Sequence, residues 1–238
     1  MLWFILAAVC AFFIKGLCGF ANTLVFTGIL SFHSNSISIS PVELLLGYPT
    51  NLILAWKERR SIRWKVCLPM AALVTSGSVP GILLLKNADT GILKIIFGAV
   101  IILVSGEMLL REMRAKKSRQ SKALLAVIGV LSGILCGLYG VGALLGAYMS
   151  RVTDSSSAFK ANICAVFLAE NTLRIILYAL WGIINADILK QSILLAPFML
   201  LGLAAGMLSA RVLNEKIVKK CVILLLMLSG VALIINSL

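Results

Sequence analysis

Long apolar runs separated by short polar breaks occupy almost the whole of this chain, and no other feature limits its possible folds as strongly. A helix needs about 20 apolar residues to cross a hydrocarbon layer roughly 30 Å thick. Runs of this kind predict an all-α polytopic membrane protein. The apolar segments are Leu2–Phe32, Val42–Trp56, Val66–Leu85, Ile92–Leu110, Ala123–Ser150, Phe159–Trp181, Ile188–Leu208 and Ile217–Leu238.

The composition excludes an ordinary soluble domain. Hydrophobic residues make up 61% of the chain and charged residues 13%, whereas soluble domains contain roughly 45–50% apolar and about 25% charged residues. The surplus must face lipid or other buried helices. A single membrane domain over residues 1–238 accounts for the whole length and leaves no room for a soluble catalytic domain. We also read the first apolar stretch as mature membrane segment and not as a signal peptide, because no basic residue precedes it.

The net charge of +13 comes from lysines and arginines in the short loops between apolar runs. This is the pattern that orients helices in a membrane. No basic face or base-reading motif accompanies the charge, so we expect no nucleic-acid partner. The partners that we expect are the lipid bilayer and a small anionic substrate, with a proton as a possible coupling ion and a homodimer as a possible assembly.

Catalytic and metal-binding signatures are absent from the sequence. There is no HExxH, no GxSxG and no phosphate-binding loop. The cysteines form no CxxC pair and lie in or beside apolar runs, where they fit as small packing residues. We therefore predict a protein that is not an enzyme, with no catalytic residues, no metal and no cofactor.

Two of the apolar segments have awkward lengths for a membrane. As single helices, Leu2–Phe32 would be about 46 Å long and Ala123–Ser150 about 42 Å, too long for one upright crossing and too short for two. Each has glycines in its middle, within Lys15–Asn22 and Cys136–Gly142. Glycine weakens a helix interior and lets backbone approach a ligand. We expect a broken helix or a re-entrant hairpin at both places.

Matching features recur at an offset of 120 to 125 residues and in unbroken order. They indicate two homologous halves, with repeat 1 over 1–111, a basic linker over 112–122 and repeat 2 over 123–238. The pairs are Gly16 with Gly137, Asn51 with Asn171, Gly77 and Gly81 with Gly202 and Gly206, and Ser105-Gly106 with Ser229-Gly230.

The loop charges favour re-entrant hairpins over full membrane crossings at the two glycine-broken segments. If both glycine-broken segments are hairpins that return to the side they entered, nearly all loop lysines and arginines lie on the inner side, as the positive-inside rule requires. Each half then has a broken or re-entrant first segment plus three transmembrane helices. Three crossings invert the second half relative to the first, which gives the inverted repeat of many transporters.

The two breaks are the strongest candidates for a binding site. A helix that restarts after a break offers free backbone N–H groups and a partial positive charge, which bind anions. The alternative is that the glycines serve only close helix packing. The substrate-binding candidates at the breaks are Gly19, Phe20, Ala21, Asn22 and Thr23 in the first and Gly140, Val141 and Gly142 in the second.

Polar residues inside apolar segments add further candidates. Asn51, next to Pro49, and Asn171 occupy matching places in the two halves, where an asparagine can bind substrate or join helices. Glu170 and Arg174 share a helix face, either as a structural ion pair or with Arg174 attracting the anion and Glu170 taking up a coupling proton.

The remaining charged residues of the apolar segments divide into two groups. Lys15 and Lys160 can draw anions into a vestibule, or can snorkel to the interface. Glu43 and Glu107 lie nearer the segment ends and are expected at the interface.

Several short motifs, taken together, resemble the TauE/SafE family of sulfite exporters, also called the 4-toluene sulfonate uptake permeases. Gly16–Leu30 and Gly129–Gly142 resemble the two glycine motifs of the family. The loop Lys57–Lys65, with Ile62-Arg63-Trp64-Lys65, resembles its basic entry to the third helix. The stretch Phe159-Lys160-Ala161-Asn162 is similar to a Phe-Arg-Ala-Thr motif, and Pro197 with the later glycines completes the pattern. The chain departs from the family in having Gly-Phe-Ala-Asn at the first break and Gly142-Ala143 at the second.

The resemblance implies a bacterial plasma-membrane permease, built by duplication of a four-segment unit and specific for sulfite, sulfonates or related anions. We expect a secondary transporter that works by alternating access, with its site between the two breaks. A passive small-anion channel and a non-transporting membrane subunit of a sulfur-metabolism complex are the alternatives.

Overall fold

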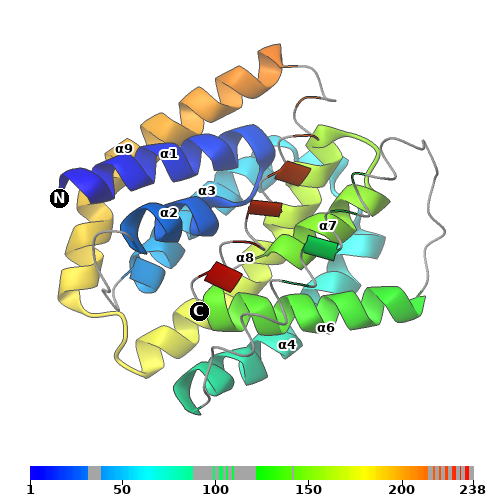
Figure 1. Ribbon diagram of the computed structural model, residues 1–238, viewed down its shortest axis with the longest axis horizontal. Coiled ribbons are helices and arrows are strands. Elements are labelled where there is room, and N and C mark those ends of the chain that lie inside the picture. Colours follow the sequence, from blue (N-terminus) through cyan, green and yellow to red (C-terminus); the bar gives the residue numbers. More distant parts are fainter. Residues whose placement is uncertain are drawn as a thin grey trace.

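The computed structural model describes residues 1–31, 39–87, 122–140 and 142–213, with single residues between 99 and 109 and between 217 and 235. Every regular element in these ranges is helical. The helices are α1 (Leu2–Cys18), α2 (Asn22–Ser31), α3 (Ile39–Lys57), the 3-10 turn η1 (Arg59–Ser61), α4 (Trp64–Asn87), α6 (Lys122–Tyr139), α7 (Ala143–Val152), α8 (Ser156–Leu180) and α9 (Ala186–Val212). Figure 1 shows them packed around the centrally placed α8.

Both predicted helix breaks are present. The first apolar segment ends its α1 helix at Gly19, which has φ +90°, and restarts at Asn22 after Ala21 with φ +71°. The second ends α6 before Gly140, with φ +68°, and restarts after Gly142. At these lengths α2 and α7 are each about 15 Å long, half of a bilayer crossing. Each short helix packs beside the longer one that precedes it, α2 on α1 and α7 on α6 (Figure 1).

Helices of one predicted half pack mainly against helices of the other half. In the largest contacts, α1 packs against α9 and α4 packs against α6. Small residues bring the backbones together in both pairs. A Cβ added at Gly16 would lie 2.5 Å from the carbonyl oxygen of Leu203, and one at Gly77 would lie 2.5 Å from that of Val130.

Three further contacts between the halves follow the same exchange. The packing of α3 on α9 corresponds to that of α8 on α4, and α3 packs on α8 in the middle. Every one of these contacts is therefore the counterpart of another, or of itself, when the two halves are interchanged. This pattern agrees with a repeat, although the inverted arrangement stays a prediction.

The outer surface is apolar. Large hydrophobic side chains such as Leu180, Ile193, Leu201 and Val212 are more than half exposed. Within the described residues, three helices are long and apolar enough to cross a membrane, over Trp64–Leu83, Ser156–Leu180 and Ala186–Val212. Most of the predicted crossing Ile92–Leu110, the linker apart from Lys122, and most of Ile217–Leu238 lie outside the described residues.

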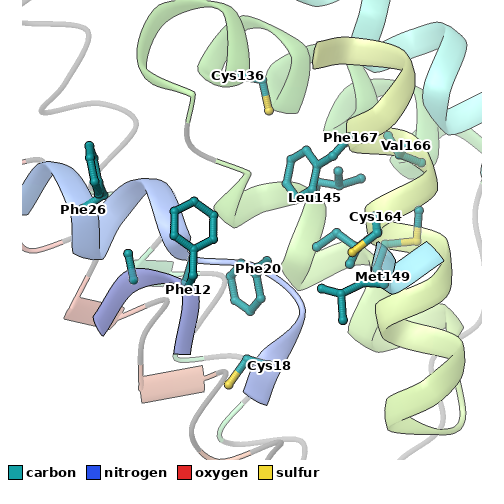
Figure 2. Close-up of a cluster of buried hydrophobic side chains, with 14 of the residues drawn as sticks. Phe12, Cys18, Phe20, Phe26, Cys136, Leu145, Met149, Cys164, Val166 and Phe167 are labelled. Carbon is teal, nitrogen blue, oxygen red and sulfur yellow. The ribbon is translucent and has the colours of Figure 1, made fainter. Parts of the chain in front are cut away.

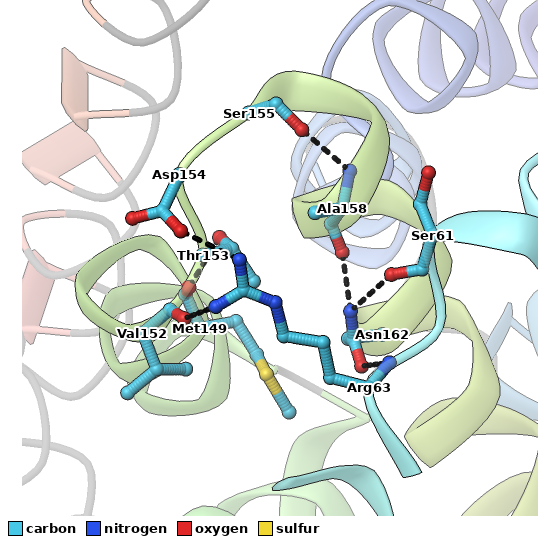
Figure 3. A network of polar contacts seen from close by, with 9 residues as sticks. All are labelled: Ser61, Arg63, Met149, Val152, Thr153, Asp154, Ser155, Ala158 and Asn162. Atoms are coloured by element: carbon cyan, nitrogen blue, oxygen red, sulfur yellow. Dashed lines mark hydrogen bonds and ion pairs between the residues drawn. The ribbon is translucent and has the colours of Figure 1, made fainter.

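A polar network joins loops of the two halves at one end of the molecule (Figure 3). Arg63 pairs with Asp154 at 2.5 Å and donates to the carbonyl of Val152 at 3.0 Å. The backbone N–H of Arg63 donates to Asn162 Oδ1 at 2.9 Å, and Asn162 Nδ2 donates to the carbonyls of Ser61 and Ala158. The loop before α4 is thus fastened to the start of α8.

The Asn162 side chain is the buried centre of this network, and replacing it tests the network's contribution to stability. The side chain is fully buried, so Asn162→Ala removes three hydrogen bonds between the loop before α4 and the start of α8 or within α8. We expect a loss of about 1–3 kcal/mol in the free energy of unfolding. Thermal unfolding of the purified protein in detergent measures it. Asp154→Asn, at the exposed rim, should change stability by less than about 1 kcal/mol, and equal losses for both would contradict this account.

Candidate functional site

Charged side chains are buried in the interior of this otherwise apolar molecule. Lys15, Glu43, Lys160, Glu170 and Arg174 are each at most 7% exposed. Uncompensated charges inside a membrane protein are costly and usually mark a transport pathway or binding site. Asn22, Thr23, Thr50, Asn51 and Asn171 are buried in the same region of the helix set.

The two breaks face each other. A Cβ at Gly140, in the second break, would lie 3.2 Å from Thr23 Cγ2 at the start of α2. A Cβ at Gly146, in the first turn of α7, would lie 3.2 Å from the ring of Phe20 in the first break. Figure 2 shows the apolar cluster around them, with Phe20 of the first break on the side of Leu145 and Met149 of α7.

Arg174 links α8 to the second break. Its Nη1 donates to the carbonyl of Cys136, one of the last carbonyls of α6, at 3.2 Å. Its Nη2 donates to Glu170 Oε2 at 3.2 Å and to Asn171 Oδ1 at 3.0 Å. A Cβ at Gly140 would come 2.8 Å from Nη1, so glycine at this position lets the guanidinium lie against the chain. The predicted pairing of Glu170 with Arg174 is present.

Lys15, Asn22 and Glu43 form a second polar group beside the first break. Lys15 Nζ donates to the carbonyl of Gly47 in α3 at 3.2 Å, and Asn22 Nδ2 donates to Glu43 Oε1. Glu43 interacts electrostatically with Lys15 and also with Arg174. Through Glu43, the polar groups of the two breaks form one connected cluster.

One expectation about these charges was wrong, and for two lysines one of the two alternatives is excluded. Glu43 is not interfacial: it is 3% exposed and bonded to the first break. Its spacing in the sequence could have revealed this, because Glu43, Gly47 and Asn51 are four residues apart and lie on one helix face. Lys15 and Lys160 do not snorkel either, since they are 1% and 7% exposed. Lys160 Nζ donates to the carbonyl of Gly16 at 3.2 Å, where its charge meets the negative end of α1.

The other predicted site residues divide into backbone and side-chain candidates. Phe20 packs edge-to-face on Phe159, with ring centroids 5.8 Å apart, so only its backbone can serve a site. Gly142 is the N-cap of α7 and offers no side-chain hydrogen bond. The first backbone N–H groups of α7 therefore have no acceptor within the helix. Val141 lies outside the described residues, and Asn51 is 1% exposed in α3.

Unpaired polar atoms mark where the cluster can accept a ligand. Among the residues described, Asn51 Oδ1, Glu170 Oε1 and Arg174 Nε are buried with no hydrogen-bond partner, and so are two hydroxyl oxygens, Thr75 Oγ1 on α4 and Ser132 Oγ on α6. Native proteins leave few buried polar atoms unpaired, and those that remain often have a functional reason. The described part of the chain contains no group of three or more His, Cys, Asp or Glu side chains that could hold a metal ion.

Comparison with known proteins gives one match. The sequence model of the family described as Sulfite exporter TauE/SafE matches residues 4–233, nearly the whole chain. No curated protein and no solved structure matches.

Proposed function

Since the chain belongs to the sulfite exporter TauE/SafE family, a family of membrane transporters for sulfur anions, we propose that it is a secondary transporter for sulfite or a small organosulfonate. In this proposal it works by alternating access as a multi-pass protein of a bacterial plasma membrane. Its two halves, 1–111 and 123–238, form an inverted repeat joined by the linker 112–122.

One observation carries the proposal: the two helix breaks meet at a buried, partly unpaired polar cluster. The restarted helices α2 and α7 offer backbone amides, and Arg174 offers an unpartnered Nε–H. Such donors suit the oxygens of a sulfite or sulfonate group, because charge-assisted bonds from arginine to oxyanions are among the strongest in proteins. The arrangement also matches transporters whose broken helices meet at mid-membrane.

The site would lie between Gly19–Thr23 and Gly140–Gly142, with Arg174 as the charged contact. Asn51 and Asn171 stand on α3 and α8, which pack against each other next to the breaks. Alternating access requires two rigid units to move relative to each other, and each unit here would contain helices of both halves. The pairs α1–α9 and α4–α6, joined at glycines, are the units that would move as rigid bodies.

Flux of sulfite into proteoliposomes tests the proposal, with sulfate, thiosulfate and small sulfonates as competitors. We expect saturable flux with counterflow. Asn51→Ala and Asn171→Ala should each lower it about tenfold, the effect of losing about 1.4 kcal/mol of hydrogen bonding in the bound state. Thr172→Ala, next to Asn171 but on the exposed side of α8, is the matched control and should keep wild-type flux.

The outcomes separate the alternatives. Flux that rises linearly with concentration and shows no counterflow would identify a passive channel. No flux above empty vesicles for any of these anions would contradict the transport proposal and favour a non-transporting subunit.

A further inference from the structure

Glu170 has one carboxylate oxygen in an ion pair and one with no partner. Its side chain is fully buried, Oε2 accepts from Arg174 Nη2 at 3.2 Å, and Oε1 has no hydrogen-bond partner among the residues described. An ionised carboxylate with a bare buried oxygen is unfavourable, whereas a carboxylic acid carries no charge. The position is therefore one at which a proton can bind at a modest cost.

Charged and titratable groups act on Glu170 from its own helix and from two neighbouring helices. On α8 itself lies Arg174, on α3 lies Glu43, and on α6 lies Cys136, which interacts electrostatically with Glu170. Glu43 is compensated from another side, by Asn22 and by Lys15 of α1. Of the two acidic groups, Glu170 is thus the one whose charge depends on Arg174 alone.

The cluster is electrically balanced without a ligand. Lys15 and Arg174 carry positive charges, and Glu43 and Glu170 carry negative charges, while the charge of Lys160 lies against the end of α1. An anion placed at Arg174 would have to compete with Glu170 for the guanidinium and would leave the buried cluster negative. Binding a proton to Glu170 together with the anion removes both penalties.

We propose that Glu170 is the proton-coupling residue of this transporter and that each anion is carried together with one proton. With no anion, ionised Glu170 pairs with Arg174. With the anion bound, Glu170 has taken a proton from water on the open side, and Arg174 pairs with the anion instead. For an anion of single charge both states of the cluster are neutral, so the complete cycle then moves no net charge. This inference rests on the proposed transport function.

Uptake of methanesulfonate into vesicles that contain a pH-sensitive dye tests the coupling, because this anion keeps a single charge over the working pH range. For the wild type, we expect one proton per anion, accumulation driven by a pH gradient, and no response to a potassium-diffusion potential. Glu170→Gln mimics the protonated state. It should keep anion counterflow but lose at least about 90% of the pH-driven accumulation, the tenfold effect that corresponds to about 1.4 kcal/mol of lost driving force.

Asp187→Asn, which removes an exposed carboxylate at the start of α9, is the control and should behave as wild type. The pH dependence of anion binding to the purified protein is a second test of the coupling. Wild-type affinity should fall about tenfold per pH unit once Glu170 ionises, the slope of a one-proton linkage, and the affinity of Glu170→Gln should be independent of pH.

Each outcome has a distinct meaning. If the wild type transports the anion but a pH gradient has no effect, or if Glu170→Gln accumulates it like wild type, the coupling inference fails and the transport function stands. If the wild type transports neither methanesulfonate nor sulfite, the proposed function itself fails, and the inference fails with it.

Discussion

Arg174→Gln is expected to lower anion flux by about two orders of magnitude, because a hydrogen bond to a charged group in a dehydrated site contributes up to about 3 kcal/mol. The same substitution should destabilise the protein by about 3–5 kcal/mol at a pH high enough to keep Glu170 ionised, and by less where Glu170 binds a proton, since it removes the partner of this buried carboxylate. Vesicle flux and thermal unfolding in detergent measure the two effects.

The double variant Arg174→Gln with Glu170→Gln separates these effects. Removing both charges replaces a buried ion pair by two neutral amides, so most of the lost stability should return. Flux should stay as low as in the single variant, because the cation that binds the anion is still missing. A double variant that regains both stability and flux would show that Arg174 is only a structural partner of Glu170.

Gly16→Ala and Gly77→Ala are expected to destabilise the protein by about 1–3 kcal/mol each, although alanine favours a helix by about 1 kcal/mol. An added Cβ would lie 2.5 Å from the backbone oxygen of Leu203 in the first case and of Val130 in the second. A neighbouring backbone cannot rotate away as a side chain can, so the paired helices must separate. Shifts in thermal unfolding measure the loss.

Gly106→Ala is the matched control, because an added Cβ at this helical position meets no atom of the described residues within 4 Å. It should be neutral or slightly stabilising. The two contact glycines belong to helix pairs that correspond when the halves are interchanged, so their losses should be similar. A large loss at Gly16 with none at Gly77 would contradict the correspondence.

The breaks were predictable because their causes are local. Each segment was too long for one crossing, and the glycines in its middle are where the chain turns, at Gly19 and Gly140 with positive φ. The pairing of Glu170 with Arg174 was predictable for the same reason, since their spacing of four residues already brings them together on one helix.

The environment of the other charges could not be predicted from local patterns. The buried Lys15 and Lys160 donate to carbonyls of α3 and of the end of α1, and those carbonyls come from distant parts of the chain. Glu43 is buried because Asn22 meets it from the first break. Likewise, the glycine spacing in α4 and α9 predicts a contact face, but the face does not show that its partner belongs to the other half.

The most direct test of the site is to locate a bound anion. Selenite, the selenium analogue of sulfite, can be bound to crystals of the protein and located by anomalous scattering. We predict a peak between the two breaks, with oxygens about 3 Å from Arg174 Nε and from the first amides of α2 or α7, and its loss in Arg174→Gln. A peak only at surface lysines or arginines, in a protein that transports sulfite, would contradict the assignment of the buried cluster as the binding site.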